Sequence, residues 1–248
     1  MLGVLLYGAG ICLIGVRTRP AEQARMRHPV RDVQAGGPAG RRFGDGANGL
    51  RPVILLTAIA AVGALNAREA RRQRRAIAAA TAGMDPAWVR DRDPDSARRL
   101  ARTCLPAAMA AVVISELVPA AGSGRRASRA ALAAGLGMTV AGAALRQRAI
   151  GTLGRFFTGS VTIQPGHSLI QAGPYRRVRH PGYAGIWLEV AGIGLASGNA
   201  IGLAVCLLLP PAGIVPRIHA EEAVLAAAFP GGYPGYAAST RRLVPFAW

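Results

Sequence analysis

Apolar residues gather in five blocks along the chain, separated by stretches rich in arginine, glycine and proline. The blocks cover residues 2–16, 52–67, 103–121, 128–145 and 183–216. A helix needs about 20 mostly apolar residues to cross a bilayer, and the third and fourth blocks approach that length. The second is shorter, and the first is a marginal anchor or first span. The pattern predicts an all-α integral membrane protein with about five to six hydrophobic helices.

The last apolar block determines the topology of the C-terminal half. As one helix, residues 183–216 would extend about 50 Å, against a hydrocarbon core of about 30 Å. Ser197-Gly198-Asn199 interrupts the block near its middle, and glycine and asparagine readily accept turn conformations. We therefore predict a C-terminal helical hairpin, 183–197 and 199–216, followed by a short cytoplasmic tail. Both flanks of this hairpin then lie on the same side of the membrane.

The polar segments suggest how the chain is divided. Residues 17–51 are predicted to be irregular, whereas 68–102 begin as a basic interfacial helix and continue into turns. We expect an N-terminal region, 1–102, with one or two membrane helices and basic loops. Residues 103–248 would then form the core of the protein.

Charge adds an orientation to this picture. The net charge is +18, and all 30 basic residues are arginine. Such a charge is common in nucleic-acid binders, but here the arginines fill the gaps between apolar blocks, which indicates membrane lipids and no nucleic acid as partners. With the hairpin flanks inside, 19 arginines lie on the cytoplasmic side and 11 outside. The positive-inside rule therefore favours a cytoplasmic active face, in a membrane that we expect to be a bacterial-type inner membrane.

The first polar cluster, PGHSLIQAGPYRRVRHPGYAG at 165–185, stands immediately before the hairpin. Pro181 suits a helix start, where its missing N–H costs nothing. His180 then lies at a helix N-terminus, where free N–H groups attract anions, and nearby arginines add positive potential. The alternative is a juxtamembrane anchor that faces lipid phosphates.

The second polar cluster is PRIHAEEAVLAAAFPGGYPGYAASTRRLVPFAW at 216–248. Arg217 and Glu221 are four residues apart and share a helical face, while Glu222 points elsewhere. A surface ion pair is the ordinary interpretation. However, Glu189, Glu221 and Glu222 are the only acidic side chains after Glu116, so an acidic pair among arginines suggests a site for a cationic group. The tail that carries Tyr233, Tyr236, Arg241 and Arg242 could fold over it.

Taken together, these motifs resemble the isoprenylcysteine carboxyl methyltransferase family, whose pattern related phospholipid N-methyltransferases share. The motifs are Gly-Pro-Tyr, Arg-His-Pro-x-Tyr-x-Gly, Arg-x-x-x-Glu-Glu, Phe-x-x-x-Tyr-x-x-Tyr and Arg-Leu-x-Pro, within residues 165–248. The segment 229–233 departs from the family pattern, because it has proline and glycine where the family more often has glycine and acids.

The resemblance implies a membrane methyltransferase that uses S-adenosyl-L-methionine without a Rossmann domain. The implied cofactor-binding residues are His167, Ser168, Leu169, Ile170, Tyr175, His180, Pro181, Gly182, Tyr183 and Glu221. Arg217 is implied to contact the methyl acceptor, and Glu222 is the second candidate catalytic residue. The expected acceptor is lipophilic, with a carboxylate oxygen as first choice and an amine as second. We expect no metal, since no His/Cys/Asp cluster has ligand spacing.

Several alternatives stay open. A sterol-reductase-like membrane enzyme would use NADPH, and a scaffold or transporter subunit would need neither ligand. Glu189 could face the pocket, and Glu116 is either functional or reaches the interface. The glycines at 192, 194, 198 and 202 favour close helix packing over a dinucleotide loop. A second Arg-His-Pro at 27–29 lacks a following Tyr, Gly or helix and is interpreted as coincidence.

Overall fold

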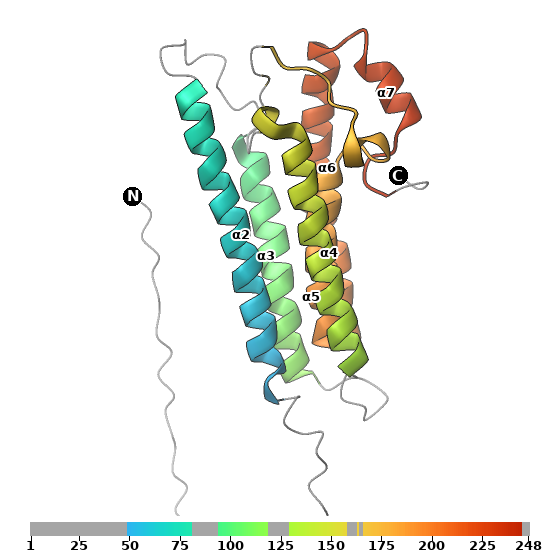
Figure 1. Cartoon of the computed structure of the whole chain (residues 1–248). Helices are drawn as coiled ribbons and strands as arrows, with labels where there is room; N and C mark the ends of the chain where they lie inside the picture. Colours follow the sequence, from blue (N-terminus) through green and yellow to red (C-terminus); the bar gives the residue numbers. More distant parts are fainter. Residues whose placement is uncertain (1–48, 81–93, 119–128, 158–162, 164–165, 245–248) are drawn as a thin grey trace, which may run out of the picture. The chain divides into compact units, whose positions relative to one another are not determined.

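The computed structural model describes residues 49–80, 94–118, 129–157, 163 and 166–244 (Figure 1). Its α-helices are α2 (Arg51–Ala80), α3 (Pro94–Leu117), α4 (Arg129–Leu153), α5 (Pro181–Ser197), α6 (Ala200–Ala228) and α7 (Tyr233–Ser239). Two 3₁₀ turns, η2 (Gly154–Phe156) and η3 (Gly173–Arg176), lie between α4 and α5. Over these residues the fold is all-helical, as predicted. The apolar block 2–16 and the Arg-His-Pro at 27–29 lie outside the described residues.

Three helices in the described part of the chain are long and apolar enough to cross a membrane: Arg51–Gln73, Arg98–Leu117 and Ala200–Ala228. Large apolar side chains on them point outward, since Val113 is 50% and Leu208 76% exposed. Such a surface is unfavourable in water and favourable against lipid tails. The prediction of an integral membrane protein is therefore confirmed. Residue 102, where the sequence division was placed, lies within α3, and the division itself stays a prediction.

The predicted turn at Ser197-Gly198-Asn199 is confirmed. Gly198 ends α5 with a φ of 71°, a left-handed conformation that glycine adopts without strain. Asn199 begins α6, and its Oδ1 accepts hydrogen bonds from the backbone N–H groups of Ile201 and Gly202 at 2.9 and 3.3 Å. Its Nδ2 also donates to the carbonyl of Val118 at 2.9 Å, which ties the hairpin turn to the end of α3.

The second arm of the hairpin is longer than predicted. α6 continues to Ala228, so the prediction that it ends at residue 216 was wrong. Pro210, Pro211 and Pro216 lie inside the helix, and a proline within a helix leaves the carbonyl four residues earlier without its usual donor. For Pro211 that carbonyl belongs to Leu207, and it accepts a hydrogen bond from the indole Nε1 of Trp187 at 3.0 Å. A neighbouring side chain thus compensates the lost bond.

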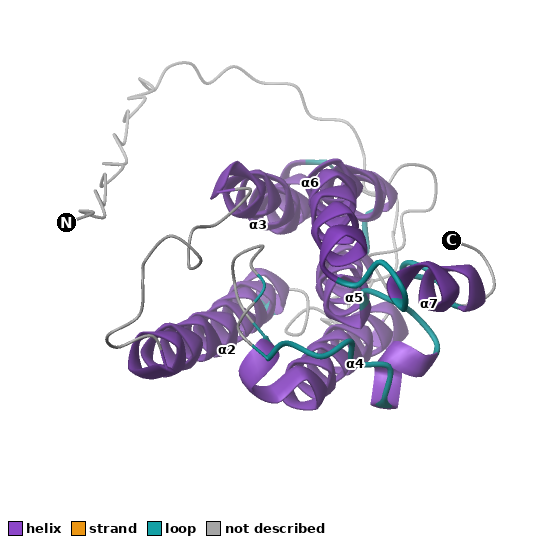
Figure 2. Ribbon diagram, turned by 90° about the horizontal axis from the view of Figure 1, so that it is seen from above, coloured by secondary structure: helices purple, strands orange, loops and turns teal. Residues whose placement is uncertain are grey.

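Glycines bring α4 and α5 into backbone contact, and Figure 2 shows the two helices side by side. A Cβ added at Gly142 would lie 2.6 Å from the carbonyl oxygen of Gly185, and one added at Gly185 would lie 2.9 Å from the Cβ of Arg146. Gly135 and Gly192 meet in the same way further along. The positions tolerate no side chain, and they fix Arg146 against the first turns of α5.

The glycines of the hairpin pack closely too. A Cβ at Gly194 would lie 2.7 Å from that of Cys206, and one at Gly202 would lie 3.2 Å from the Cα of Ala111. Ala107, Ala111, Val190 and Cys206 form a buried cluster there, which joins α3, α5 and α6. These contacts confirm the packing interpretation of the glycine repeat, and they leave no phosphate-binding loop at this place.

Candidate active site

The loop before α5 and the tail after α7 are joined through their backbones. The N–H groups of Arg179 and His180 donate to the carbonyls of Arg241 and Arg242, at 2.6 and 2.9 Å. His180 stands at the N-cap of α5 and Pro181 is the first helical residue, as predicted. The two polar clusters of the sequence therefore meet at one end of the hairpin.

Glu221 lies at the centre of the first group of contacts. Its Oε2 is 3.5 Å from Nδ1 of His180, and its Oε1 is 3.5 Å from Nε of Arg217. The Nε of Arg217 donates to the hydroxyl of Tyr183 at 2.6 Å, and that hydroxyl donates to Oε1 of Glu221. The shared helical face of Arg217 and Glu221 is thus confirmed. Arg217 is buried, so its charge needs this compensation.

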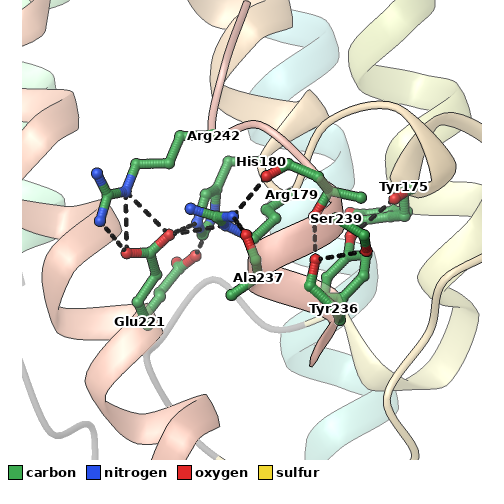
Figure 3. A network of polar contacts seen from close by, with 10 residues as sticks. Tyr175, Arg179, His180, Glu221, Tyr236, Ala237, Ser239 and Arg242 are labelled. Carbon is green, nitrogen blue, oxygen red and sulfur yellow. Dashed lines mark hydrogen bonds and ion pairs between the residues drawn. The ribbon is translucent and has the colours of Figure 1, made fainter. Parts of the chain in front are cut away.

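Glu222 lies in a second group of contacts, directed toward the tail. Figure 3 shows Arg179, His180, Glu221 and Arg242 gathered in one polar network. Its carboxylate is 3.0 Å from Nε of Arg179 and 3.0 Å from Nη2 of Arg242. Arg179 also donates through Nη1 to the carbonyls of Ala237 and Thr240, the latter at 2.6 Å. We call Arg179, Glu222 and Arg242 the tail clamp, because together they hold α7 and the tail against the loop.

His180 bridges the two carboxylates. Its Nε2 is 3.5 Å from Oε1 of Glu222, on the opposite side of the ring from Glu221. Burial alone would lower the pKa of His180, but the two neighbouring carboxylates outweigh it and hold this pKa above its usual value. The imidazole therefore favours its charged form, in which both nitrogens carry a proton.

A cavity of about 250 Å³ opens beside Glu221. Nine of the ten predicted cofactor residues line it: His167, Ser168, Leu169, Ile170, Tyr175, His180, Gly182, Tyr183 and Glu221. Arg217 lines it too, whereas Pro181 is buried beside it and Glu222 belongs to the tail clamp. The structure thus brings the predicted residues together, and their roles stay predictions. Tyr236 of α7 also reaches the wall, so the tail does fold over the site.

Aromatic rings form one side of the cavity around His167. Its ring stacks on Phe156, with centroids 4.6 Å apart, and meets Phe229 edge-on at 5.8 Å. Burial lowers the pKa of His167 and favours the neutral ring. Its Nδ1 is buried and makes no hydrogen bond within the described residues. The sequence analysis did not identify Phe156 as a residue of the cavity, because no motif or spacing pattern includes it.

Sequence reasoning also missed Arg146 of α4, which lines the cavity from the side of the helix bundle. Its Nε donates to Oδ1 of Asn66 on α2 at 3.0 Å, and Nδ2 of Asn66 donates to Oε2 of Glu189 on α5 at 3.5 Å. Glu189, which the sequence placed as a potential pocket residue, is buried behind Arg146 and is not part of the wall. Only the packing of three separate helices brings this trio together.

Fold and site together define a helical membrane protein with a polar cavity at one end of a helical hairpin. The sequence model of the isoprenylcysteine carboxyl methyltransferase family matches residues 135–227. The match confirms, for this region of the chain, the resemblance drawn from the motifs. The match begins within α4 and therefore includes Arg146.

The relatives agree with this assignment. Over 114 residues the chain is 33% identical to a probable protein-S-isoprenylcysteine O-methyltransferase of Oryza sativa subsp. indica, covering 45% of this chain and 60% of the relative. It is 33% identical, again over 114 residues, to protein-S-isoprenylcysteine O-methyltransferase A of Arabidopsis thaliana, covering 45% of this chain and 58% of that relative. The chain thus spans about 60% of the length of the curated relatives it matches.

One solved structure shares the fold. It is that of the eukaryotic intramembrane Ras methyltransferase ICMT, with a TM-score of 0.50 and 22% sequence identity. The similarity covers 79% of this chain and 68% of the other. At this identity the likeness supports the helical architecture and not a shared substrate.

Proposed function

We propose that the protein transfers a methyl group from S-adenosyl-L-methionine to a lipophilic acceptor, on a carboxylate oxygen, at the cytoplasmic face of the membrane. The cavity beside Glu221 supports this most strongly. It combines a carboxylate, three arginines, tyrosines and histidines with an apolar wall, and it adjoins helices long and apolar enough to cross a bilayer. The relatives named as O-methyltransferases of isoprenylcysteine suggest the same acceptor class.

The residues on the cavity wall fit S-adenosyl-L-methionine. Glu221 offers a carboxylate for an ammonium or for ribose hydroxyls, and the unpaired Nδ1 of His167 offers an acceptor. Phe156 and Phe229 offer ring faces and edges beside it. When bound, the cofactor supplies a methyl carbon activated by a sulfonium. Within the described residues no group of three His, Cys, Asp or Glu side chains could hold a metal ion.

The residues of the protein then position the reacting groups. A carboxylate acceptor is ionised at neutral pH, so its oxygen attacks without a general base. Arg217, itself fixed by Tyr183 and Glu221, holds such a carboxylate in line with the methyl carbon. Tyr236 and the tail exclude water from above. Because no base is required, the ion pairs of Glu222 favour a structural over a catalytic role for it.

Ligand-dependent melting of the purified protein tests the proposal. S-adenosylhomocysteine should raise the melting temperature of the wild type, and NADPH should not. His219→Ala, an exposed position on the same helix, serves as control and should keep the full shift. A shift with NADPH alone would indicate a reductase, and a shift with neither ligand would favour a scaffold. Transfer of a labelled methyl group to an S-prenylated N-acetylcysteine then tests the acceptor.

The orientation of the protein in the membrane is tested in a separate experiment. Single cysteines at Gly231 and Arg241, both exposed, should react with a membrane-impermeant maleimide only when the cytoplasmic side is accessible. The wild type, with its native thiols, gives the background. Labelling from the opposite side would overturn the proposed cytoplasmic face and the bacterial-type inner-membrane topology together.

A further inference from the structure

Five arginines meet where the loop before α5 and the tail after α7 are joined. Val178 of the loop forms a parallel β-bridge with Arg241 of the tail, and the backbone N–H of Arg179 donates to the carbonyl of Arg241. Two of the five, Arg179 and Arg242, share the carboxylate of Glu222. The other three are exposed and take part in no ion pair among the described residues, and we call them the rim arginines: Arg176, Arg177 and Arg241.

The rim arginines lie at the depth of lipid headgroups. α5 runs from Pro181 to Ser197, next to the hairpin turn, and its 17 residues span about 26 Å. It packs along α6, which is long and apolar enough to cross a membrane. With the turn near one surface of a hydrocarbon core of about 30 Å, the loop that ends at His180 lies at the other surface, where lipid phosphates begin.

This half of the chain has few carboxylates to balance the junction. After Glu116 the sequence contains three acidic residues. Glu189 is buried in the helix bundle, and Glu221 contacts Arg217 at the cavity. Glu222 pairs with two of the five arginines. Docking of the tail therefore gathers like charges within a Debye length of about 10 Å, and an anion at this place would offset their repulsion.

We propose that the rim arginines bind the phosphate groups of anionic membrane lipids, and that the bound lipid holds the tail against the loop. A guanidinium matches two phosphate oxygens with parallel hydrogen bonds. Because Arg176 and Arg177 belong to the loop and Arg241 to the tail, lipid phosphates at the rim bridge the two segments. Tyr236 of α7 lines the cavity, so the same lipid favours a covered cavity. Lipid binding of this kind needs only the membrane and the docked tail, and does not depend on the proposed reaction.

Hydrogen–deuterium exchange of the whole protein in lipid nanodiscs tests the proposal. Discs of zwitterionic phosphatidylcholine are compared with discs that also contain anionic phosphatidylglycerol. The backbone amides of Arg179 and His180 bond the tail, so a peptide that covers them reports on docking. In the anionic discs their exchange should slow by about tenfold, because several arginines near an anionic surface act together.

Neutralising the rim separates the effect of charge from that of packing. In the triple variant Arg176→Gln, Arg177→Gln and Arg241→Gln, exchange at Arg179 and His180 should be the same in both kinds of disc. In phosphatidylcholine this exchange should be no faster than in the wild type, because the repulsion between the arginines is removed. A variant that also exchanges faster within α3 and α6 is misfolded, and the double variant Arg177→Gln and Arg241→Gln then replaces it.

A matched control removes the same charge from exposed positions on α2: Arg71→Gln, Arg72→Gln and Arg75→Gln. α2 and α4 run in the same direction, because Leu55 packs in one cluster with Leu132 and Asn66 bonds Arg146 further along. The three α2 arginines therefore lie toward the same end of the molecule as the loop before α5. This control should keep the tenfold slowing in anionic discs, because its rim is intact.

The outcomes separate the lipid site from its alternatives. Equal exchange of the wild type in both discs would show that no anionic lipid holds the tail. An equal loss of the lipid effect in the rim variant and the α2 control would indicate general surface charge and no site. If inorganic phosphate added to phosphatidylcholine discs slows exchange as strongly as phosphatidylglycerol, the rim binds free phosphate and the lipid assignment is wrong. None of these results depends on whether the protein binds S-adenosylhomocysteine.

Discussion

Two neighbouring carboxylates on α6 have different surroundings. Glu221 faces the cavity and contacts Tyr183, Arg217 and His180. Glu222 faces the tail and pairs with Arg179 and Arg242. Successive residues of an α-helix point about 100° apart, so one turn of α6 serves two surfaces. The comparison teaches that an acidic pair in a sequence need not be one functional unit.

The largest effect is expected from Glu221→Gln. The substitution keeps the size of the side chain but removes the charge that the ligand and Arg217 share. Affinity for S-adenosylhomocysteine should fall by about 10- to 100-fold, measured by calorimetry. Tryptic cleavage at Arg241 and Arg242 should stay slow, because the tail clamp is intact. Unchanged affinity would remove Glu221 from the binding site.

A second, smaller effect is expected from Glu222→Gln. Loss of both ion pairs should destabilise the docked tail by about 2 kcal/mol, less than for a fully buried pair because the Arg242 side chain is 30% exposed. Trypsin should then cut at Arg241 and Arg242 about 30-fold faster, which mass spectrometry can follow. If methyl transfer disappears while the tail stays protected, Glu222 is catalytic after all.

The role of His180 in joining Glu221 and Glu222 can be tested by measuring stability as a function of pH. The pKa of His180 lies above its ordinary value, so its contribution to stability is complete below about pH 6.5 and is lost as the pH rises through the folded-state pKa. The melting temperature of the wild type should therefore fall as the pH rises above about 6.5. His180→Gln should flatten this dependence. Equal slopes in the two proteins would show that His180 does not join the carboxylates.

The smallest effect is expected at His219, which lies between Arg217 and Glu221 in sequence but is exposed on the opposite face of α6. His219→Ala should change the free energy of unfolding by less than about 0.5 kcal/mol and leave ligand affinity as it is. Chemical denaturation and calorimetry measure both quantities. A marked loss in either would mean that the helix face assigned to solvent has a partner.

Local signals in the sequence predicted much of this arrangement. Ser197-Gly198-Asn199 marks the hairpin turn by its conformational preferences, and the spacing of Arg217 and Glu221 gives their shared face. Arg146 could not be found in the same way, because its partners come from α2 and α5 and only helix packing unites them. The length of α6 was missed for a related reason, since a side chain from another helix offsets the loss at Pro211.

The indole of Trp187 has a consequence beyond hydrogen-bond satisfaction. In lipid, an unsatisfied carbonyl oxygen is costly, so sliding α5 along α6 would have to break the bond to Leu207 at a high penalty. Trp187 thus adds to the turn at Gly198 and Asn199 in fixing the axial register of the two hairpin arms. The depth at which His180 lies relative to Glu221 is therefore held by an anchor within the bilayer as well as by the polar groups that meet at the end of the hairpin.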